Sequence, residues 1–325
     1  MNWQPTATRA VLRARARMLQ KTRDFFAQRD VLEVETPILT PCGITDPNIK
    51  SVSAQLTGQP HSAFFLHTSP EFAMKRLLAA GMPDIFQICK VFRDGESGSA
   101  HQPEFTMIEW YRRDWSMMEM IDETCALIAS ALCETNLPVN KISYRDLFTS
   151  MSEIDPFAAS TQEIISWAQQ NIKTVTPTLS EQIGHDRSTW LDLIISHAII
   201  PALPPETLLV IHHYPAEQAA LARLDPKDKS VAERFEVIYR GMELANGFRE
   251  LTNADEQRRR FETDNARRAQ DNQKVMPIDT QFLAALEAGL PDCSGVAVGF
   301  DRLVMLACGL ESIDQAISLA LQQQQ

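Results

Sequence analysis

Four separated segments of the chain carry residue types that could share one reaction site. They are Ser69–Glu71, Phe92–Tyr111, Glu243–Glu250 and Gly295–Arg302. Arginine side chains suit phosphate groups because the planar guanidinium can donate two parallel hydrogen bonds. Carboxylates suit metal ions and ammonium groups, and an aromatic ring can stack on a nucleotide base. Together the segments predict a site for a nucleotide, a metal ion and an amino group.

The second segment predicts a hairpin of two strands, Ile85–Arg93 and Glu104–Arg112, joined by a polar loop. Side chains two apart on a strand share a face. One face of the second strand would carry Phe105, Met107, Glu109 and Tyr111, and one face of the first would carry Gln87, Cys89, Val91 and Arg93. If these faces coincide, a guanidinium lies beside an aromatic ring and a carboxylate. The alternative is an ordinary amphipathic hairpin with a surface arginine.

The third segment places Asn246, Phe248 and Glu250 on one strand face, with Glu236 on the strand before. Acids on a buried sheet face are costly unless they are paired or bound to a metal ion. Glu236 and Glu243 could bind Mg²⁺, which prefers oxygen ligands. Strand parity puts Glu243 on the face opposite Asn246, so this role requires a bulge. The alternative is an edge strand with one solvated face.

The last segment predicts a strand of small residues, Ser294–Gly299, that leads into a helix beginning near Phe300–Arg302. Glycine permits close approach of a ligand to such a strand. In the first helical turn Arg302 can reach a phosphate or stack on a base, and the helix dipole also favours anions there. Ordinary helix capping is the alternative.

Composition and periodicity set the class of protein. With 325 residues, of which 44% are hydrophobic and 22% charged, the chain can bury a large core. Helical periodicity predicts helices over residues 8–29, 72–80, 117–135, 254–271 and 301–309. Further strands are predicted over residues 31–36, 208–214, 234–240, 243–251 and 296–299, whereas residues 140–206 carry little functional signal. We expect one mixed α+β domain over residues 1–325, built on an antiparallel sheet flanked by helices.

Charge and cysteine content narrow the function. A net charge of −11 argues against a broad nucleic-acid-binding surface. Two arginine-rich helical segments, 9–23 and 258–268, could dock an acidic partner or could be solvated helix faces. The six cysteines form no C-x-x-C pair, so neither disulfides nor zinc are expected. We find no signal-peptide pattern and no apolar run that could span a bilayer, which predicts a cytoplasmic protein without membrane contact.

Six short motifs together resemble a known family. They are Val34–Pro37, Thr68–Glu71, Phe92–Arg93, Pro103–Met107, Glu243–Phe248 and Gly299–Arg302. They resemble the signature motifs of class II aminoacyl-tRNA synthetases, especially the lysyl branch. Lysyl-tRNA synthetases carry an N-terminal anticodon-binding barrel, whereas this chain enters the first motif almost at once. The resemblance is therefore greatest to the truncated branch that joins (R)-β-lysine to elongation factor P, as the stretch Pro291–Gly295 also indicates.

The resemblance implies ATP and Mg²⁺ as cofactors, with Arg93 and Arg302 as the catalytic arginines that hold phosphates. Phe105 would stack on adenine, and Glu236 and Glu243 would hold the metal ion. The implied ATP site comprises Arg93, Asp94, Gly95, Glu96, His101, Gln102, Phe105, Glu243, Leu244, Gly299 and Arg302. The implied amino-acid pocket comprises Ser69, Pro70, Glu71, Glu109, Tyr111, Asn246, Phe248, Glu250 and Ala297.

Three positions depart from the lysyl-tRNA synthetase pattern. Gly95 stands where the family usually has an acid that accepts the adenine amine, and the acid is next door at Glu96. Gln102 replaces a common asparagine with a longer side chain that has the same hydrogen-bonding groups. Ala297 replaces a glycine, and its methyl group could favour β-lysine over α-lysine, a discrimination worth about 1–3 kcal/mol.

We therefore expect a ligase that forms a β-lysyl-adenylate and passes the acyl group to a lysine side chain of elongation factor P. One alternative is a compact lysyl-tRNA synthetase-like enzyme that acylates tRNA, which the acidic net charge disfavours. Another is a non-catalytic regulatory paralogue, which the retained Arg93, Glu243 and Arg302 disfavour. The resemblance also implies a homodimer through the first motif.

Overall fold

The computed structural model describes residues 3–59, 62–134 and 136–321. The chain forms two compact units. Unit 1 comprises Met1–Thr135 with Glu250–Gln325, and unit 2 comprises Asn136–Arg249. Within the described residues, every helix is too short or too polar to cross a membrane.

The main sheet of unit 1 has four strands in the order β1-β5-β6-β11. Their bounds are β1 Leu32–Glu33, β5 Ile85–Phe92, β6 Glu104–Arg113 and β11 Cys293–Gly299. The strands β5, β6 and β11 pair antiparallel, whereas β1 pairs parallel to β5. A second sheet contains β2 Leu39–Thr40, β4 Phe64–Leu66 and β3 Ser53–Ala54. The predicted strand over residues 31–36 is thus much shorter than expected, because only two of its residues pair with β5.

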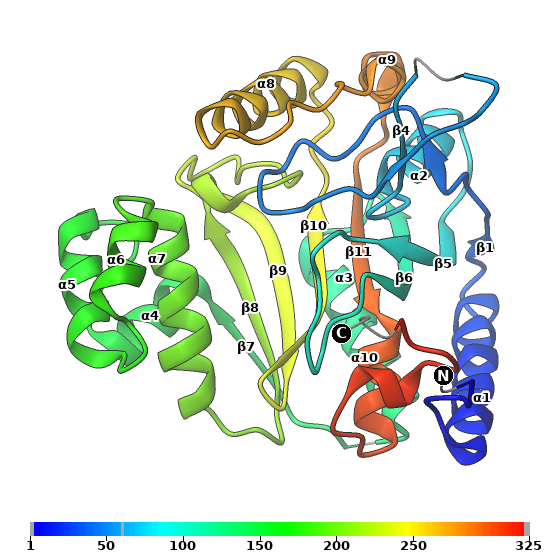
Figure 1. Cartoon of the computed structure of the whole chain (residues 1–325), viewed down its shortest axis with the longest axis horizontal. Coiled ribbons are helices and arrows are strands. Elements are labelled where there is room, and N and C mark those ends of the chain that lie inside the picture. Colours follow the sequence, from blue (N-terminus) through cyan, green and yellow to red (C-terminus); the bar gives the residue numbers. More distant parts are fainter. Residues whose placement is uncertain (1–2, 60–61, 135, 322–325) are drawn as a thin grey trace. The chain divides into compact units, whose positions relative to one another are not determined.

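Helices of unit 1 lie around these strands (Figure 1). Their bounds are α1 Arg9–Ala27, α2 Glu71–Ala79, α3 Met117–Leu132, α8 Ala254–Gln270, α9 Thr280–Gly289, α10 Phe300–Ala307 and the 3₁₀ turn η4 Ile313–Ala316. Side-chain oxygens cap several N-termini, among them Thr8, Ser116 and Asn253. The predicted helix over residues 117–135 ends at Leu132 because Cys133 is left-handed, with φ 58°. Thr135 lies outside the described residues.

Unit 2 has the strand order β10-β9-β8-β7. Its strands are β7 Val139–Ser143, β8 Leu208–Pro215, β9 Val231–Tyr239 and β10 Met242–Arg249, and β7 pairs parallel to β8. Its helical elements are α4 Tyr144–Ser152, α5 Thr161–Asn171, α6 Pro177–Ile183, α7 Arg187–Ile194, the π-helix η1 Ile195–Ile199 and the 3₁₀ turns η2 Ile200–Ala202 and η3 Ala216–Gln218. Buried Tyr144, Phe148 and Trp190 pack with Leu209 and Ile211 of β8. Residues 144–202 therefore form a helical layer over the sheet of this unit.

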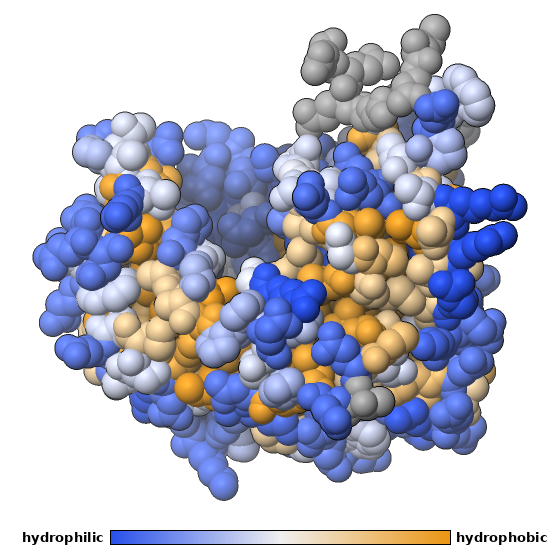
Figure 2. Space-filling model, turned by 90° about the horizontal axis from the view of Figure 1, so that it is seen from below, coloured by the Kyte–Doolittle hydropathy of each residue, from blue (hydrophilic) through white to orange (hydrophobic). Residues whose placement is uncertain are grey.

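Both units combine a mostly antiparallel sheet with packed helices, which confirms the predicted α+β class. Figure 2 shows one face of the molecule, where polar and charged side chains surround patches of apolar side chains. All six cysteines are free thiols in the structure.

Candidate active site

The predicted coincidence of strand faces is present in unit 1. Gln87 of β5 lies directly opposite Glu109 of β6, and Val91 lies opposite Phe105. On the other side of β6, Ala297 of β11 lies opposite Glu109. Residues directly opposite one another point to the same side of a sheet. This face of unit 1, the front face, therefore gathers aromatic, acidic and small side chains from three strands.

Glu109 is the buried acid at the centre of the front face. Its side chain accepts hydrogen bonds from the hydroxyls of Ser69 and Tyr111, each at 2.7 Å. The Oγ of Ser69 also accepts a hydrogen bond from the backbone N–H of Glu71, the first residue of α2, at 3.1 Å. Burial and the neighbouring Glu71 raise the pKa of Glu109 to about 7. An ammonium group placed beside Glu109 would stabilise its charged form.

A second buried acid, Glu250, lies close to Tyr111 and to β11. A Cβ atom added to Gly295 would lie 2.3 Å from the Tyr111 ring and 2.4 Å from Oε1 of Glu250. Glycine is therefore required at this position by close packing. The Glu250 carboxylate forms an ion pair with Lys75 of α2 at 2.5 Å. Burial raises the pKa of Glu250 to about 8, although Lys75 acts in the opposite direction.

Arg93 lies where β5 enters the loop that joins it to β6. The centre of its guanidinium is 5.2 Å from the centroid of the Phe105 ring, so the guanidinium and the aromatic ring lie together as strand parity predicts. Its Nη1 lies 3.4 Å from the carboxylate of Glu96, so this acid contacts the arginine. Gly95 has φ +79°, a conformation that strains residues with a Cβ atom. The exposed Asp94 is anchored through its backbone N–H, which donates to the carbonyl of Lys50 at 2.8 Å.

Arg302 comes from the first turn of α10, immediately after Gly299. Its Nη2 lies 2.8 Å from Nε2 of His101 in the β5–β6 loop, so the two predicted ATP-binding residues lie together. Burial and Arg302 lower the pKa of His101, which favours a neutral ring that accepts this hydrogen bond. Gln102, also predicted to bind ATP, donates to the carboxylate of Asp314 at 2.6 Å and anchors η4.

Asp301 has a structural part in the same motif. It is almost fully buried and pairs with Arg15 of α1, while its other oxygen accepts from the backbone N–H of Thr106 at 2.7 Å. Arg15 also donates to the Thr106 hydroxyl at 2.7 Å. The aspartate thus fixes α10, and with it Arg302, against β6 and α1.

Several arginines of the two basic segments are not available for docking. Arg15 is paired with Asp301, and Arg268 is buried with its guanidinium against the carbonyls of Thr45, Asp46 and Ile49. The docking interpretation is therefore wrong for Arg15 and Arg268, because both guanidinium groups hold the fold of unit 1 together.

The bulge that the metal prediction required is present in unit 2. The β9–β10 register shifts between Glu243 and Ala245, so that Glu243 lies opposite Ile238 and Asn246 lies opposite Glu236. Because Glu236 and Ile238 share a face, the bulge puts Glu243 on the face of Glu236 and Asn246. Simple parity had placed Glu243 on the other side.

Glu236 already has two partners in unit 2. Its Oε1 lies 2.5 Å from Nη2 of Arg234, and its Oε2 accepts from the Tyr214 hydroxyl at 2.7 Å. Glu236 and Glu243 both help to raise the pKa of Arg234 against the effect of burial. Within the described residues there is no group of three or more His, Cys, Asp or Glu side chains spaced to hold a metal ion. Two carboxylates that share a face still match the oxygen chemistry of Mg²⁺, which commonly takes substrate phosphates as its other ligands.

The other two predicted residues of unit 2 are packed on β10. Leu244, the extra residue of the bulge, is buried. Phe248 is partly buried and packs against Ala219, Ala222 and Ala232. Near the predicted pocket in unit 1, Pro70 accepts the first hydrogen bond of α2 from the N–H of Met74 at 2.9 Å.

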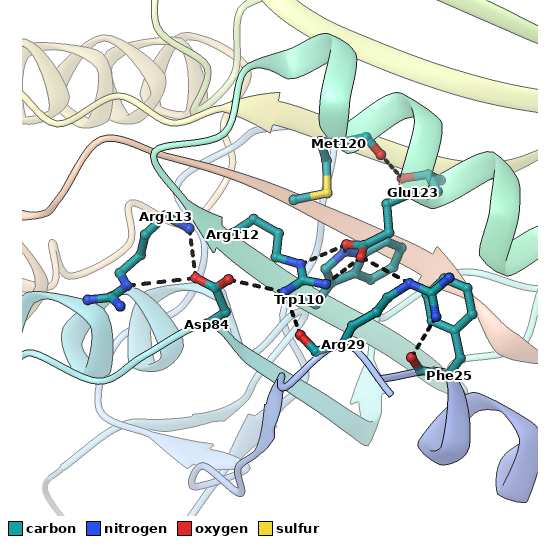
Figure 3. Close-up of polar contacts among 9 residues, drawn as sticks. Phe25, Arg29, Asp84, Trp110, Arg112, Arg113, Met120 and Glu123 are labelled. Carbon is teal, nitrogen blue, oxygen red and sulfur yellow. Dashed lines mark hydrogen bonds and ion pairs between the residues drawn. The ribbon is translucent and has the colours of Figure 1, made fainter. Parts of the chain in front are cut away.

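The back of β6 is braced by a buried ion-pair network (Figure 3). Glu123 of α3 accepts from Nε of Arg112 at 2.9 Å and from Nε1 of Trp110 at 3.0 Å. Arg112 continues to Asp84 at 3.1 Å and to the carbonyl of Arg29 at 3.3 Å. Trp110 and Arg112 alternate with Glu109 and Tyr111 on β6, so they point to the opposite face of the sheet. The network therefore fixes the strand that carries Glu109.

Two residues near the site were not predicted. Lys75 is completely buried, and the only sequence signal for it is its spacing of four residues from Glu71 on a predicted helix. Gln87 was placed on the correct face but was given no role. It is 2% exposed, and its Oε1 has no hydrogen-bond partner among the described residues.

Comparisons with known proteins show the family to which the chain belongs. The family model for class II tRNA synthetases (D, K and N) matches residues 1–323. The chain therefore belongs to the class II tRNA synthetase family. Within that class, the chain is 44% identical over 324 residues to an elongation factor P–(R)-β-lysine ligase of Avibacterium paragallinarum, with 98% of each chain covered. It is 45% identical over 324 residues to the ligase of that name from Klebsiella pneumoniae subsp. pneumoniae, with 98% of this chain and 97% of the relative covered.

The similarity extends to a third genus. The chain is 42% identical over 325 residues to a Pasteurella multocida protein of the same name, with 99% of this chain and 98% of the relative covered. The predicted resemblance to elongation factor P–(R)-β-lysine ligases is thus confirmed.

Proposed function

We propose that this protein is an ATP-dependent ligase that activates (R)-β-lysine as an adenylate and transfers it to a lysine side chain of elongation factor P. The observation that carries the proposal is the pair of buried acids, Glu109 and Glu250, on a surface formed by family motifs. Buried carboxylates need cationic partners, and a diamino acid supplies two. The names of relatives that match nearly the whole chain support the same substrate and acceptor.

In the proposed reaction the residues act by positioning and by stabilising charge. Arg93 and Arg302 bind the phosphates of ATP, and Phe105 stacks on the base. Glu109 and Glu250 bind the ammonium groups, so that the substrate carboxylate faces the α-phosphorus. The carboxylate attacks, pyrophosphate leaves, and the acceptor amine then displaces AMP from the adenylate. A side-chain nucleophile is not needed.

Glu236 and Glu243 would hold Mg²⁺ when ATP is bound. The ion would neutralise charge on the phosphates and on the leaving pyrophosphate. Each oxygen of Glu236 already accepts one hydrogen bond, from Arg234 or from Tyr214, and keeps a lone pair that could bind the ion.

We further propose a cytoplasmic homodimer. Leu32 and Ile38, which flank the first motif, are 47% and 39% exposed and are suited to burial in a two-fold interface. Light scattering at micromolar protein concentration would report twice the mass of one chain. A monomer at that concentration would contradict this part of the proposal.

The function is tested by the fate of labelled amino acid. The protein is incubated with ATP, Mg²⁺ and radiolabelled (R)-β-lysine or α-lysine, with either purified elongation factor P or bulk tRNA as acceptor. We expect label on elongation factor P, more from β-lysine than from α-lysine, and loss of label with Arg93→Ala but not with Lys173→Ala, at an exposed lysine outside the named sites. Label on tRNA alone would contradict the proposal, and the absence of any adenylate would favour a regulatory paralogue.

A further inference from the structure

Lys75 is a buried cation between two of the acids assigned to the amino-acid pocket. Its side chain has no exposed surface, and its Nζ lies 2.5 Å from both the Glu71 and the Glu250 carboxylates. Burial alone would lower the pKa of Lys75, but Glu250 and Glu71 raise it above its ordinary value. Lys75 therefore carries a positive charge inside unit 1.

Among the described residues, no cation lies at contact distance from the third acid, Glu109. The partners of Glu109 are the hydroxyls of Ser69 and Tyr111, and Lys75 reaches it only as a longer-range charge. Beside it, the buried carbonyl oxygen of Gln87 has no partner among the described residues. The Glu109 carboxylate and the unpaired Gln87 oxygen lie on the same face of the sheet. Together they point to a ligand that donates hydrogen bonds and carries positive charge.

The charges of this cluster do not balance within the protein. The carboxylates of Glu71, Glu109 and Glu250 carry three negative charges when ionised, and Lys75 carries one positive charge. Two negative charges therefore remain, and buried charge is costly unless it is paired. A ligand with two ammonium groups cancels both, whereas a ligand with one leaves a buried acid unpaired or protonated.

We propose that Lys75 is a specificity-determining residue: by neutralising one of three clustered acids it sets the pocket to accept two ammonium groups, which selects a diamino acid over a monoamino acid. The inference rests on the proposed function for the location of the amino-acid pocket. It assigns Lys75 no contact with the reacting atoms. Its role is to set how many negative charges of the pocket remain to bind ammonium groups of the substrate.

The test measures binding rather than catalysis. Equilibrium dialysis without ATP compares (R)-β-lysine with its analogue that has a methyl group in place of the terminal ammonium group. We expect the wild type to prefer β-lysine by at least about 100-fold, because the analogue leaves polar groups of the protein's pocket unpaired. Glu250→Gln leaves one uncompensated negative charge, so this preference should fall at least about tenfold.

The decisive variant is Lys75→Met/Glu250→Gln, which removes one charge of each sign and restores the original balance. Its preference for β-lysine should exceed that of Glu250→Gln by at least about threefold, and it should stay below that of the wild type because the Glu250 carboxylate itself is missing. Lys75→Met alone leaves Glu71 and Glu250 without their cation and should be strongly destabilised. The test therefore rests on the double variant. Thermal unfolding checks that this variant is folded. Lys90→Met, the same change at a partly exposed lysine on β5, should alter nothing.

Two results would overturn the inference. In the first, the folded double variant discriminates as poorly as Glu250→Gln, so that Lys75 acts through geometry and not through charge. In the second, the wild type binds the two compounds equally. Because the assay contains no ATP, normal discrimination without adenylate formation would instead count against the proposed function alone.

Discussion

Lowering the pH from 8 to 6 should weaken binding of the diamino acid through Glu109. The pKa of this buried carboxyl is raised to about 7, so it carries a proton at pH 6 and is ionised at pH 8. A neutral carboxyl attracts an ammonium group far less than a carboxylate does. The KM for the amino acid should therefore fall as the pH rises through this window.

The size of the effect follows from the ionised fraction. For a pKa of about 7, that fraction is roughly one-tenth at pH 6 and roughly nine-tenths at pH 8, which changes the KM about tenfold. Glu250, whose pKa is raised to about 8, adds to the change in the same direction. The terminal ammonium of the substrate, with an ordinary pKa of about 10.4, stays charged throughout.

Burial of Glu109, more than its charged neighbours, sets the direction of this prediction. Glu71 raises its pKa, and Lys75 and the hydrogen bonds from Ser69 and Tyr111 lower it, but burial outweighs them. Across the strand pair, burial and Glu109 raise the pKa of the Cys89 thiol to about 12, so Cys89 stays neutral in this window.

ATP–pyrophosphate exchange at pH 6, 7 and 8 measures the KM for the amino acid and for ATP separately. Glu109→Gln should raise the amino-acid KM and flatten its pH dependence, whereas Glu104→Gln, at an exposed acid on the same strand, should keep the wild-type profile. A wild-type KM that is constant between pH 6 and 8 would refute the reasoning. An unchanged slope in Glu109→Gln would assign the titration to another group.

Two further predictions concern packing and stability. Gly295→Ala places a methyl group against the Tyr111 ring, so it should lower the free energy of unfolding by about 1–3 kcal/mol and raise the amino-acid KM. The matched control is Gly58→Ala, which has open space around it. An unchanged KM in Gly295→Ala would contradict the packing account. Asp301→Asn removes the charge that pairs with Arg15, so the free energy of unfolding measured in urea should fall by about 3 kcal/mol; a change below about 1 kcal/mol would show that this pair does not anchor α10.

The front face could be predicted from strand parity because its residues lie on regular strands. Alternation grouped Phe105, Glu109 and Tyr111, and the register of β5 with β6 confirms that Gln87 shares their side. The position of Glu243 could not be derived in this way, since a bulge of one residue reverses parity and leaves no clear signal in one sequence.

The role of Lys75 could not be predicted for a different reason. A glutamate and a lysine four residues apart on a helix usually form a solvated surface pair. The burial of Lys75 depends on the packing of α2 against α9, where the ring centroids of Phe72 and Phe282 lie 4.5 Å apart. The helix α9 itself was not predicted. Long-range packing thus decides which charged residues become part of the pocket.

The central claim is that the acyl group goes to a protein lysine, and intact-mass spectrometry of elongation factor P tests it most directly. After incubation with the protein, ATP, Mg²⁺ and (R)-β-lysine, the account predicts a mass increase of one lysyl residue on a single lysine side chain. The increase should require ATP and be absent with Arg93→Ala. An unchanged mass of elongation factor P, with the amino acid recovered on tRNA, would contradict the account.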